Sequence, residues 1–347
     1  MCVNIFFFTA AAGRTALRID AALRASGRET TLYTVGKVAS ENADFMEIRP
    51  SLKEVTGRLF RAGEGLVFIG AAGIAVRSIA PFIKGKDEDP PVLVIDEKGN
   101  FVVPILAGHI GGANALARHL AKALGAVPVL TTATDVNGLF AVDEWAVKKG
   151  FTLSSLQDAK AFAAALLDEG RAGVSTDFIM DGPLPPGLEI KEKGPVGMAV
   201  TAFADKCPFG VTVRVYPPVL HIGVGCRRGK GRARIRKAVE AALNEAGLAP
   251  EAIKDFNTID IKADEAGLLE AAESFGVPLH LYSAERLREV NGNFTTSDFV
   301  RQNVGVDNVC ERAALAGAVT GKLIVRKYAR DGVTVAVAVD GASLSWE

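Results

Sequence analysis

The segment 108–114, with the sequence GHIGGAN, contains residue types that can perform acid–base chemistry. Histidine exchanges protons near neutral pH, so His109 can serve as a general base. The amides of Gly111 and Gly112, at the start of a predicted helix, can stabilise an oxyanion, and Asn114 can orient a carbonyl group or a water molecule. The alternative is structural, because a histidine can bond to nearby backbone groups and glycines permit close packing.

A second candidate is the glycine-rich segment 70–77, GAAGIAVR, between a predicted strand and a predicted helix. Gly70 and Gly73 would let backbone amides converge on an anion, and Arg77 can bind a carboxylate through two hydrogen bonds. A plain strand-to-helix connection is the alternative. The segment has neither the Gly-Lys-Ser/Thr ending of a phosphate loop nor the GxGxxG spacing, which disfavours nucleotide binding.

The segment 131–135, TTATD, follows the next predicted strand. Ligands of doubly wound sheets bind outside the carboxyl ends of the strands. We therefore expect Thr132 and Asp135 to line one crevice together with the two glycine-rich turns. The alternative is that these side chains cap the helical segment that begins near Asn137.

A third glycine-rich turn, 223–232 with the sequence GVGCRRGKGR, is strongly basic. Positive charge at a helix N-terminus opposes the helix dipole, which favours an anionic ligand at this turn. Gly225, Cys226 and Arg227 are candidate ligand contacts, whereas we interpret the arginines within 232–236 as a solvated face. Cys226 beside these cations would have a lowered thiol pKa, which makes it a minor candidate nucleophile.

Glu311 is the last candidate, at the start of a predicted Ala-rich helix. A carboxylate in a first helical turn is favourable to the dipole, and this is a sufficient structural explanation. A catalytic role is the alternative. No metal site is expected, because the four histidines neither cluster with cysteines nor follow the HExxH spacing.

Runs rich in Val, Ile and Phe alternate with Ala- and Leu-rich segments of helical period, which is the pattern of an α/β fold. We expect open, mostly parallel sheets covered by helices. The first strands are predicted at 3–8, 66–69, 92–95, 102–106 and 127–130. The clearest helix begins after Gly112 and ends at Gly125. Its leucines predict one buried face: Leu116, Leu120 and Leu124. The segment 96–100, DEKGN, predicts a β-hairpin.

Two main domains plus a small middle region are expected from the length and from changes in texture. Residues 1–149 form the first predicted domain. Residues 150–218 form a middle domain or connector, which is rich in proline and ends at Pro217-Pro218. A fresh alternation of strands and helices then predicts a last α/β domain over 219–347.

Charge and cysteine content restrict the partners and the compartment. Forty basic and forty acidic side chains cancel, so no long-range field attracts nucleic acid or a membrane surface. No apolar run reaches the roughly 20 residues of a membrane span. The four cysteines form no CxxC pair, which indicates reduced thiols and a cytoplasmic protein. The sequence does not determine the oligomeric state.

Taken together, the motifs resemble the CbiG family of cobalt-precorrin 5A hydrolases. The segments that carry the resemblance are GAAGIAVRSIAPFI, AGHIGGANALARHLA, TTATD, GVGCRRGKG, NVCERAALAGA and TVAVAV. They span most of the chain, and the match is weakest over 150–218.

The resemblance implies hydrolysis of the ring A lactone of cobalt-precorrin 5A to cobalt-precorrin 5B, with release of acetaldehyde, in anaerobic cobalamin biosynthesis. The partner would be a small-molecule corrinoid that carries the cobalt itself, so no cofactor is expected, and contacts with neighbouring pathway enzymes would be transient. Combined with the residues, this predicts His109 as the base and Arg77 and Arg227 as cations that hold the macrocycle between the first and last domains. The alternative is a non-catalytic carrier of the tetrapyrrole intermediate.

Overall fold

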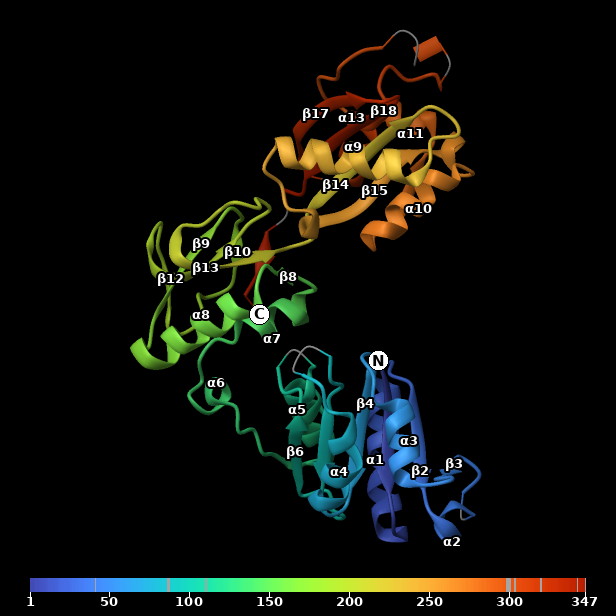
Figure 1. The fold of residues 1–347 in the computed structure, drawn as a ribbon, viewed down its shortest axis with the longest axis vertical. Helices are drawn as coiled ribbons and strands as arrows, with labels where there is room; N and C mark the ends of the chain where they lie inside the picture. The colour runs from blue at the N-terminus through green and yellow to red at the C-terminus, as the bar shows by residue number, and fades with distance from the viewer. Residues whose placement is uncertain are drawn as a thin grey trace. The chain divides into compact units, whose positions relative to one another are not determined.

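The computed structural model describes residues 1–40, 42–85, 88–109, 111–297, 301–302, 304–318, 320–341 and 343–346. The chain divides into two units, Met1–Glu144 and Trp145–Glu347, each described below by itself (Figure 1). Both units contain mostly parallel sheets covered by helices, as the sequence predicts. Within the described residues, the structure contains no helix with the length and apolar composition needed to cross a bilayer.

The first unit is built on a seven-stranded sheet of order β3-β2-β1-β4-β5-β6-β7. Its strands are β1 (Cys2–Phe7), β2 (Thr30–Thr34), β3 (Phe45–Glu47), β4 (Glu64–Ile69), β5 (Val92–Ile95), β6 (Phe101–Leu106) and β7 (Val127–Pro128). Strands β1 to β5 are parallel, β6 is antiparallel to β5, and β7 is parallel to β6.

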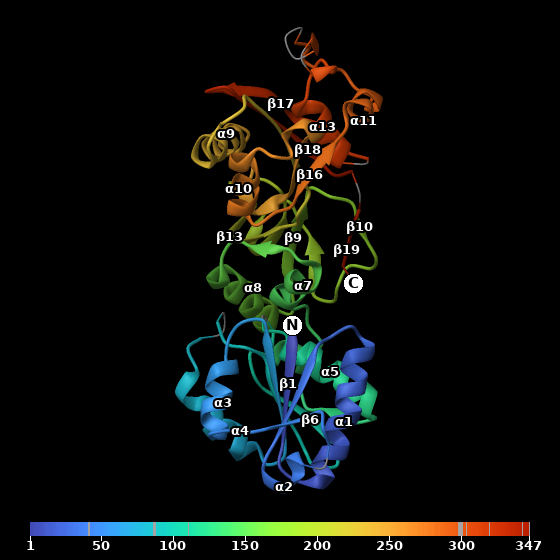
Figure 2. The ribbon, with the colours of Figure 1, turned by 90° about the vertical axis from the view of Figure 1, so that its right-hand side faces the viewer.

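Helices cover both faces of this sheet, as Figure 2 shows. Helices α1 (Ala10–Ala25) and α5 (Ala113–Leu124) pack on one face, and α3 (Leu52–Leu59) and α4 (Ala72–Ile79) pack on the other. The shorter elements are α2 (Gly36–Ala39), η1 (Ala80–Phe82) and α6 (Ala133–Val136). In α5 the predicted leucine face is buried: Leu116, Leu120 and Leu124. A sheet buried on both faces requires nearly continuous apolar strands, and β1 has this composition.

The predicted hairpin between β5 and β6 is present. The Asp96 side chain organises its turn, because its carboxylate accepts hydrogen bonds from the amides of Lys98 (3.0 Å), Asn100 (2.7 Å) and Phe101 (2.6 Å). The hairpin reverses the chain, so β6 and β7 end at the edge of the sheet where β4 begins. The expectation that all three loops line one crevice is therefore wrong. It treated the sheet as fully parallel, although the hairpin itself requires one reversal.

The second unit contains two five-stranded sheets. The first, of order β11-β9-β12-β13-β8, lies within the predicted middle region. Its strands are β8 (Thr152–Leu153), β9 (Ala172–Thr176), β11 (Leu188–Ile190), β12 (Gly194–Val200) and β13 (Phe209–Tyr216). Helix α8 (Leu156–Glu169) packs on it, and β10 (Met180–Asp181) pairs with the C-terminal β19 (Leu344–Ser345). The boundary between the two units falls within helix α7 (Val142–Lys149).

The second sheet of this unit has the order β16-β15-β14-β18-β17. Its strands are β14 (Leu220–Cys226), β15 (Ile253–Ile259), β16 (Leu279–Tyr282), β17 (Lys322–Arg330) and β18 (Val333–Val339). Helices α9 (Arg232–Glu245) and α10 (Ala266–Phe275) share a core with one face, and α13 (Cys310–Gly317) packs on the other. The remaining elements are η2 (Pro250–Ala252), η3 (Asp260–Lys262) and α11 (Ala284–Glu289).

Candidate functional site

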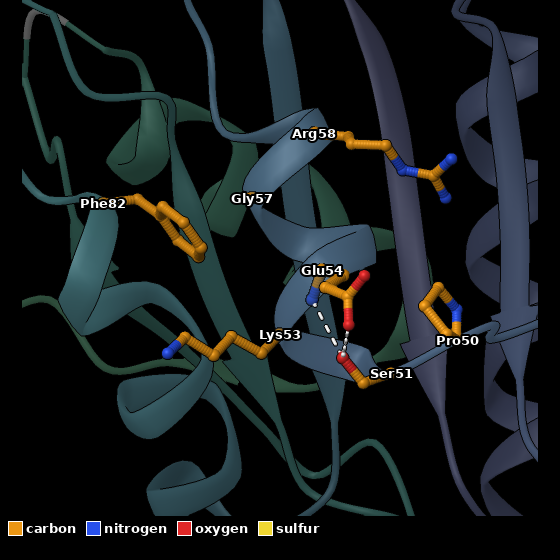
Figure 3. A pocket seen from close by; sticks show the side chains of 7 residues that line it. All are labelled: Pro50, Ser51, Lys53, Glu54, Gly57, Arg58 and Phe82. Carbon is orange, nitrogen blue, oxygen red and sulfur yellow. Dashed lines mark hydrogen bonds between the residues drawn. The ribbon is translucent and has the colours of Figure 1, made fainter.

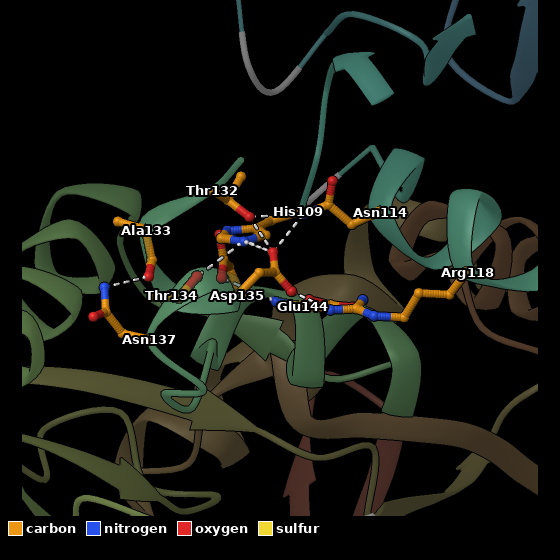
Figure 4. Close-up of polar contacts among 10 residues, drawn as sticks. His109, Asn114, Arg118, Thr132, Ala133, Thr134, Asp135, Asn137 and Glu144 are labelled. Carbon is orange, nitrogen blue, oxygen red and sulfur yellow. Dashed lines mark hydrogen bonds and ion pairs between the residues drawn. The ribbon is translucent and has the colours of Figure 1, made fainter. Parts of the chain in front are cut away.

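The loop between β6 and α5 presents His109 at one edge of the first sheet (Figure 4). Close packing accounts for Gly111, because an added Cβ would overlap the Ala107 side chain and lie 2.9 Å from its carbonyl oxygen. Gly112 has a left-handed backbone, with φ of 84°, and caps α5. Its amide donates a 2.9 Å hydrogen bond to the His109 carbonyl, so this amide already has a partner inside the loop.

The His109 ring lies between two carboxylates. Its Nδ1 is 3.3 Å from Asp143 Oδ2, and its Nε2 is 3.4 Å from Asp135 Oδ2 and 3.1 Å from Thr134 Oγ1. The hydrogen bond to Asp143 raises the pKa of His109 above its ordinary 6.5, and the charges of Asp143 and Asp135 act in the same direction against the opposing effect of burial. The two carboxylates therefore make the His109 ring a stronger base than an ordinary histidine.

Four residues predicted from the sequence meet in this cluster: His109, Asn114, Thr132 and Asp135. The Asn114 side-chain amide donates to Asp135 Oδ2 at 2.7 Å and to Thr132 Oγ1 at 3.1 Å, and the Thr132 hydroxyl donates to Asp135. Burial acts to raise the pKa of Asp135, but the Thr132 hydrogen bond and the Arg118 charge outweigh it and lower that pKa. Asp135 is thus a mostly buried carboxylate whose ionised form is stabilised by hydrogen bonds and by the Arg118 charge.

Sequence reasoning missed four residues that complete the cluster: Arg118, Thr134, Asp143 and Glu144. The Arg118 guanidinium pairs with Asp135 through Nη2 and with Glu144 Oε1 through Nη1, at 3.0 Å for the latter (Figure 4). The sequence spacing could have identified Arg118. It follows Asn114 by four residues, so the two side chains lie on the same face of α5. Thr134 lies within the TTATD segment but was not singled out there, whereas Asp143 and Glu144 gave no comparable signal, because no motif connects them to His109.

Three of these side chains are of metal-ligating types. One nitrogen or oxygen atom from each of His109, Asp135 and Glu144 lies within 4.8 Å of the others. However, the Arg118 guanidinium already bridges the two carboxylates. A metal ion would have to displace this internal cation, so ligand type alone does not make the cluster a metal centre.

The turn containing Gly70, Gly73 and Arg77 lies elsewhere in the first unit. It follows β4, beside β1, where the strand order reverses direction and where doubly wound folds bind ligands. Gly70 has φ of 147°, and the exposed Arg77 side chain folds back toward the position of a Gly73 Cβ. The hairpin reversal separates this turn from His109 by the length of the sheet.

A surface groove of about 610 Å³ lies along α3 (Figure 3). The Phe82 ring covers Gly57, and an added Cβ there would approach it to 2.6 Å. Ser51 caps α3 by accepting from the Glu54 amide at 3.3 Å. The lining residues are Pro50, Ser51, Lys53, Glu54, Gly57, Arg58 and Phe82, and none of them is a predicted site residue.

The basic turn after β14 belongs to the second unit and is partly neutralised by its own chain. Arg228 pairs with Asp264 at 3.1 Å, and the Gly229 amide donates to Glu265 Oε1 at 2.7 Å. Arg227 is exposed, and its amide donates to the Gly332 carbonyl at 3.1 Å. An external anion is therefore not the sole counter-charge at this turn.

The expectation of a lowered Cys226 pKa is wrong. Burial raises the pKa of this thiol, and nearby Glu265 adds to the effect, which outweighs the opposing charges of Lys262 and Lys230. A half-buried thiol with a raised pKa is a poor nucleophile. Gly225, Cys226 and Arg227 remain candidate ligand contacts.

Glu311 is fully buried at the start of α13. Its carboxylate accepts four hydrogen bonds: from the Thr295 amide (2.7 Å), the Thr295 hydroxyl (2.9 Å), the Asn308 side chain (3.0 Å) and the Lys327 amide (2.8 Å). Both oxygens are thus occupied inside the protein. These contacts favour the structural interpretation of Glu311 over the catalytic one.

Comparison with known proteins identifies the family. Residues 54–135 match the family model described as cobalamin synthesis G N-terminal, and residues 220–338 match cobalamin synthesis G C-terminus. A relative from Salmonella typhimurium, named cobalt-precorrin-5A hydrolase, is 34% identical over 322 residues, which cover 89% of this chain and 91% of the relative. The chain belongs to the cobalamin synthesis G (CbiG) family.

Other CbiG relatives span similar lengths. A cobalt-precorrin-5A hydrolase from Priestia megaterium is 34% identical over 311 residues, covering 83% of this chain and 82% of the relative. A crystal structure of a putative cobalamin biosynthesis protein G homolog from Sulfolobus solfataricus covers 97% of this chain and 96% of its own, with 22% identity and a TM-score of 0.43. The CbiG resemblance predicted from the motifs is confirmed, and the N-terminal CbiG match includes His109 and Asp135.

Proposed function

We propose that this CbiG-family chain is a hydrolase that opens the ring A lactone of cobalt-precorrin 5A, giving cobalt-precorrin 5B and acetaldehyde in cobalamin biosynthesis. Relatives that are 34% identical over most of their length carry the name cobalt-precorrin-5A hydrolase. The observation that carries the proposal is the position of His109 between two carboxylates, because lactone hydrolysis requires a base that activates water.

In this mechanism the neutral His109 ring removes a proton from water. The resulting hydroxide attacks the lactone carbonyl, and the ring C–O bond breaks to give a carboxylic acid and an alkoxide. The alkoxide becomes a carbonyl group as its carbon–carbon bond to the macrocycle breaks, which releases acetaldehyde and leaves the electron pair of that bond on the macrocycle. The imidazolium returns its proton to the macrocycle. The charges of Asp143 and Asp135 stabilise the imidazolium between these two steps. The well-hydrogen-bonded Asp135 remains an anion throughout, so it stabilises charge and does not itself transfer the proton.

Cations would bind the peripheral carboxylates of the corrinoid, the small-molecule partner in this proposal. Arg118 belongs to the His109 cluster and keeps 44% of its side-chain surface exposed beside its two internal partners. Arg77 and Arg227 are exposed at glycine-rich turns of the first and second units. The cobalt enters within the substrate, and Arg118 occupies the position that a protein-bound ion would need. The purified enzyme should therefore keep its rate after treatment with a chelator.

The test compares the H109Q variant with the parental protein, with acetaldehyde release as the assay. Loss of a general base lowers the rate by about a hundredfold or more. The matched control is H280Q, because His280 is a half-exposed histidine of the second unit that lies outside the cluster. Parental rates in H109Q would disprove the assignment of the base. Tight corrinoid binding by the parental protein without acetaldehyde would instead indicate a carrier.

A further inference from the structure

We propose that Asp143 is the residue that positions His109, an inference that rests on the hydrolase function proposed above. Asp143 lies in the first turn of α7, outside every motif of the glycine-rich loops. Its Oδ2 faces His109 Nδ1 at 3.3 Å, and its Oδ1 accepts a 3.0 Å hydrogen bond from the Glu144 amide. The helix start thus fixes one carboxylate oxygen and directs the other toward the imidazole.

The two carboxylates beside His109 have different hydrogen-bonding capacity. Asp135 Oδ2, on the Nε2 side, already accepts from Asn114 and Thr132, and Asp135 Oδ1 pairs with Arg118. Asp143 Oδ2 is the freer acceptor. A neutral imidazole carries one proton, and the better acceptor retains it. The geometry therefore assigns that proton to Nδ1, between His109 and Asp143.

This tautomer leaves Nε2 unprotonated, as a general base requires. Nε2 faces the Thr134 hydroxyl at 3.1 Å, and a hydroxyl can donate to an unprotonated ring nitrogen. Without the Asp143 carboxylate, Asp135 becomes the stronger acceptor near the ring and favours the proton on Nε2. The base would then be blocked, although the ring itself would remain in place.

Several charged groups near the His109 ring affect the pH at which the ring titrates. Asp143 of α7 and Asp135 of α6 favour the imidazolium, whereas Arg118 of α5 acts through Asp135, and Glu144 lies behind Arg118. Asp143 is the largest cause of the raised His109 pKa. Removing its charge should therefore move the His109 titration to lower pH, an effect that a merely structural residue would not produce.

The experiment measures two properties of full-length D143N. We expect kcat to fall by about a hundredfold or more while KM changes little, because the base is disabled and substrate contacts remain. NMR titration of the His109 ring without substrate should give a midpoint at lower pH than in the parental protein. The matched control D158N removes another acidic residue from the first turn of a helix, α8, and should change neither property.

Two further variants keep the test decisive if D143N folds poorly. D143E retains the charge and should recover part of the rate. In an H109Q background, D143N should cause little further loss, because a positioning residue acts only through the residue that it positions. A parental rate with D143N, or full additivity with H109Q, would overturn the proposal.

The NMR arm separates this inference from the proposed function. If H109Q hydrolyses the lactone at the parental rate, the proposed base is wrong whatever D143N does. If H109Q is inactive but the His109 titration in D143N matches that of the parental protein, the base stands and the role of Asp143 is wrong.

Discussion

The carboxylate of Glu311 accepts a 2.8 Å hydrogen bond from the main-chain amide of Lys327. It thereby ties the start of α13 to β17, while Thr295 and Asn308 donate to the same side chain. This arrangement gives a buried charge enough donors to compensate for its removal from water.

Glu311→Gln is expected to destabilise the second unit and to leave the chemistry intact. Glutamine presents an NH₂ group toward donors, so at least one buried donor loses its acceptor, which costs about 1–3 kcal/mol. Urea unfolding measures this loss, with the exposed Glu289→Gln as control. A large fall in kcat at unchanged stability would instead return Glu311 to a catalytic role.

The pH dependence of the reaction follows from the raised pKa of His109. The base is active when neutral, so activity is lost as the pH falls through that pKa. The acid limb of kcat/KM should have its midpoint above 6.5, the ordinary value for histidine. The residual activity of H109Q should show no such limb. A limb below 6.5 in the parental enzyme would contradict the contacts of the ring.

Arg118→Met should convert the cluster into a cation site. The substitution removes the guanidinium between Asp135 and Glu144, while three ligating side chains stay within reach of one another. Two adjacent carboxylates without a counter-charge favour a divalent ion. Thermal unfolding with and without Mn²⁺ provides the measurement, and we expect a larger rise in Tm for R118M than for the parental protein. Equal rises would show that Arg118 does not exclude the ion.

Gly223→Ala should be strongly destabilising. An added Cβ would overlap the carbonyl oxygen of Cys310 and lie 2.7 Å from the Ala314 amide nitrogen, so α13 could not keep its position on β14. Overpacking of this kind costs about 1–3 kcal/mol or more. Gly231→Ala is the control, because its φ is −74° and a Cβ there meets nothing within 4 Å. Equal Tm values for the two variants would contradict the packing.

Arg227→Ala should raise KM for the corrinoid with little change in kcat, because an exposed cation at a loop contributes to binding in the ground state and the transition state alike. Arg228→Ala is the comparison variant. Arg228 already pairs with Asp264, which partly neutralises its charge, so its loss should raise KM less. Steady-state kinetics at two salt concentrations would distinguish them. Identical KM values for R227A and the parental enzyme would remove Arg227 from the binding surface.

Local patterns predicted the elements well. The leucine spacing of α5 located its buried face, and Asp96 with its following residues marked the hairpin, because both signals lie within a few residues of one another. His109 and Asn114 were identified for the same reason, since one glycine-rich loop contains both.

The meeting of Asn114 with Thr132 and Asp135 was predicted, but relationships that depend on chain direction or on segments outside the motifs were not. Asp143 reaches His109 across more than thirty residues, and neither residue type specifies the other. The thiol of Cys226 was misjudged because its neighbours in sequence are cations, whereas burial has the larger effect on its pKa. Burial depends on packing against other elements, which local composition does not reveal.

The reversal of β6 has a thermodynamic consequence for the first unit. Arg77 and His109 lie at opposite ends of the sheet and share no partner among the residues that the structure describes, so their substitutions should combine independently. The fold reduction in kcat/KM of the double variant R77A/H109Q should equal the product of the two single reductions. Substrate affinity and turnover would then depend on separate residues at the two ends of one sheet. Evolution or engineering could change either property without changing the other.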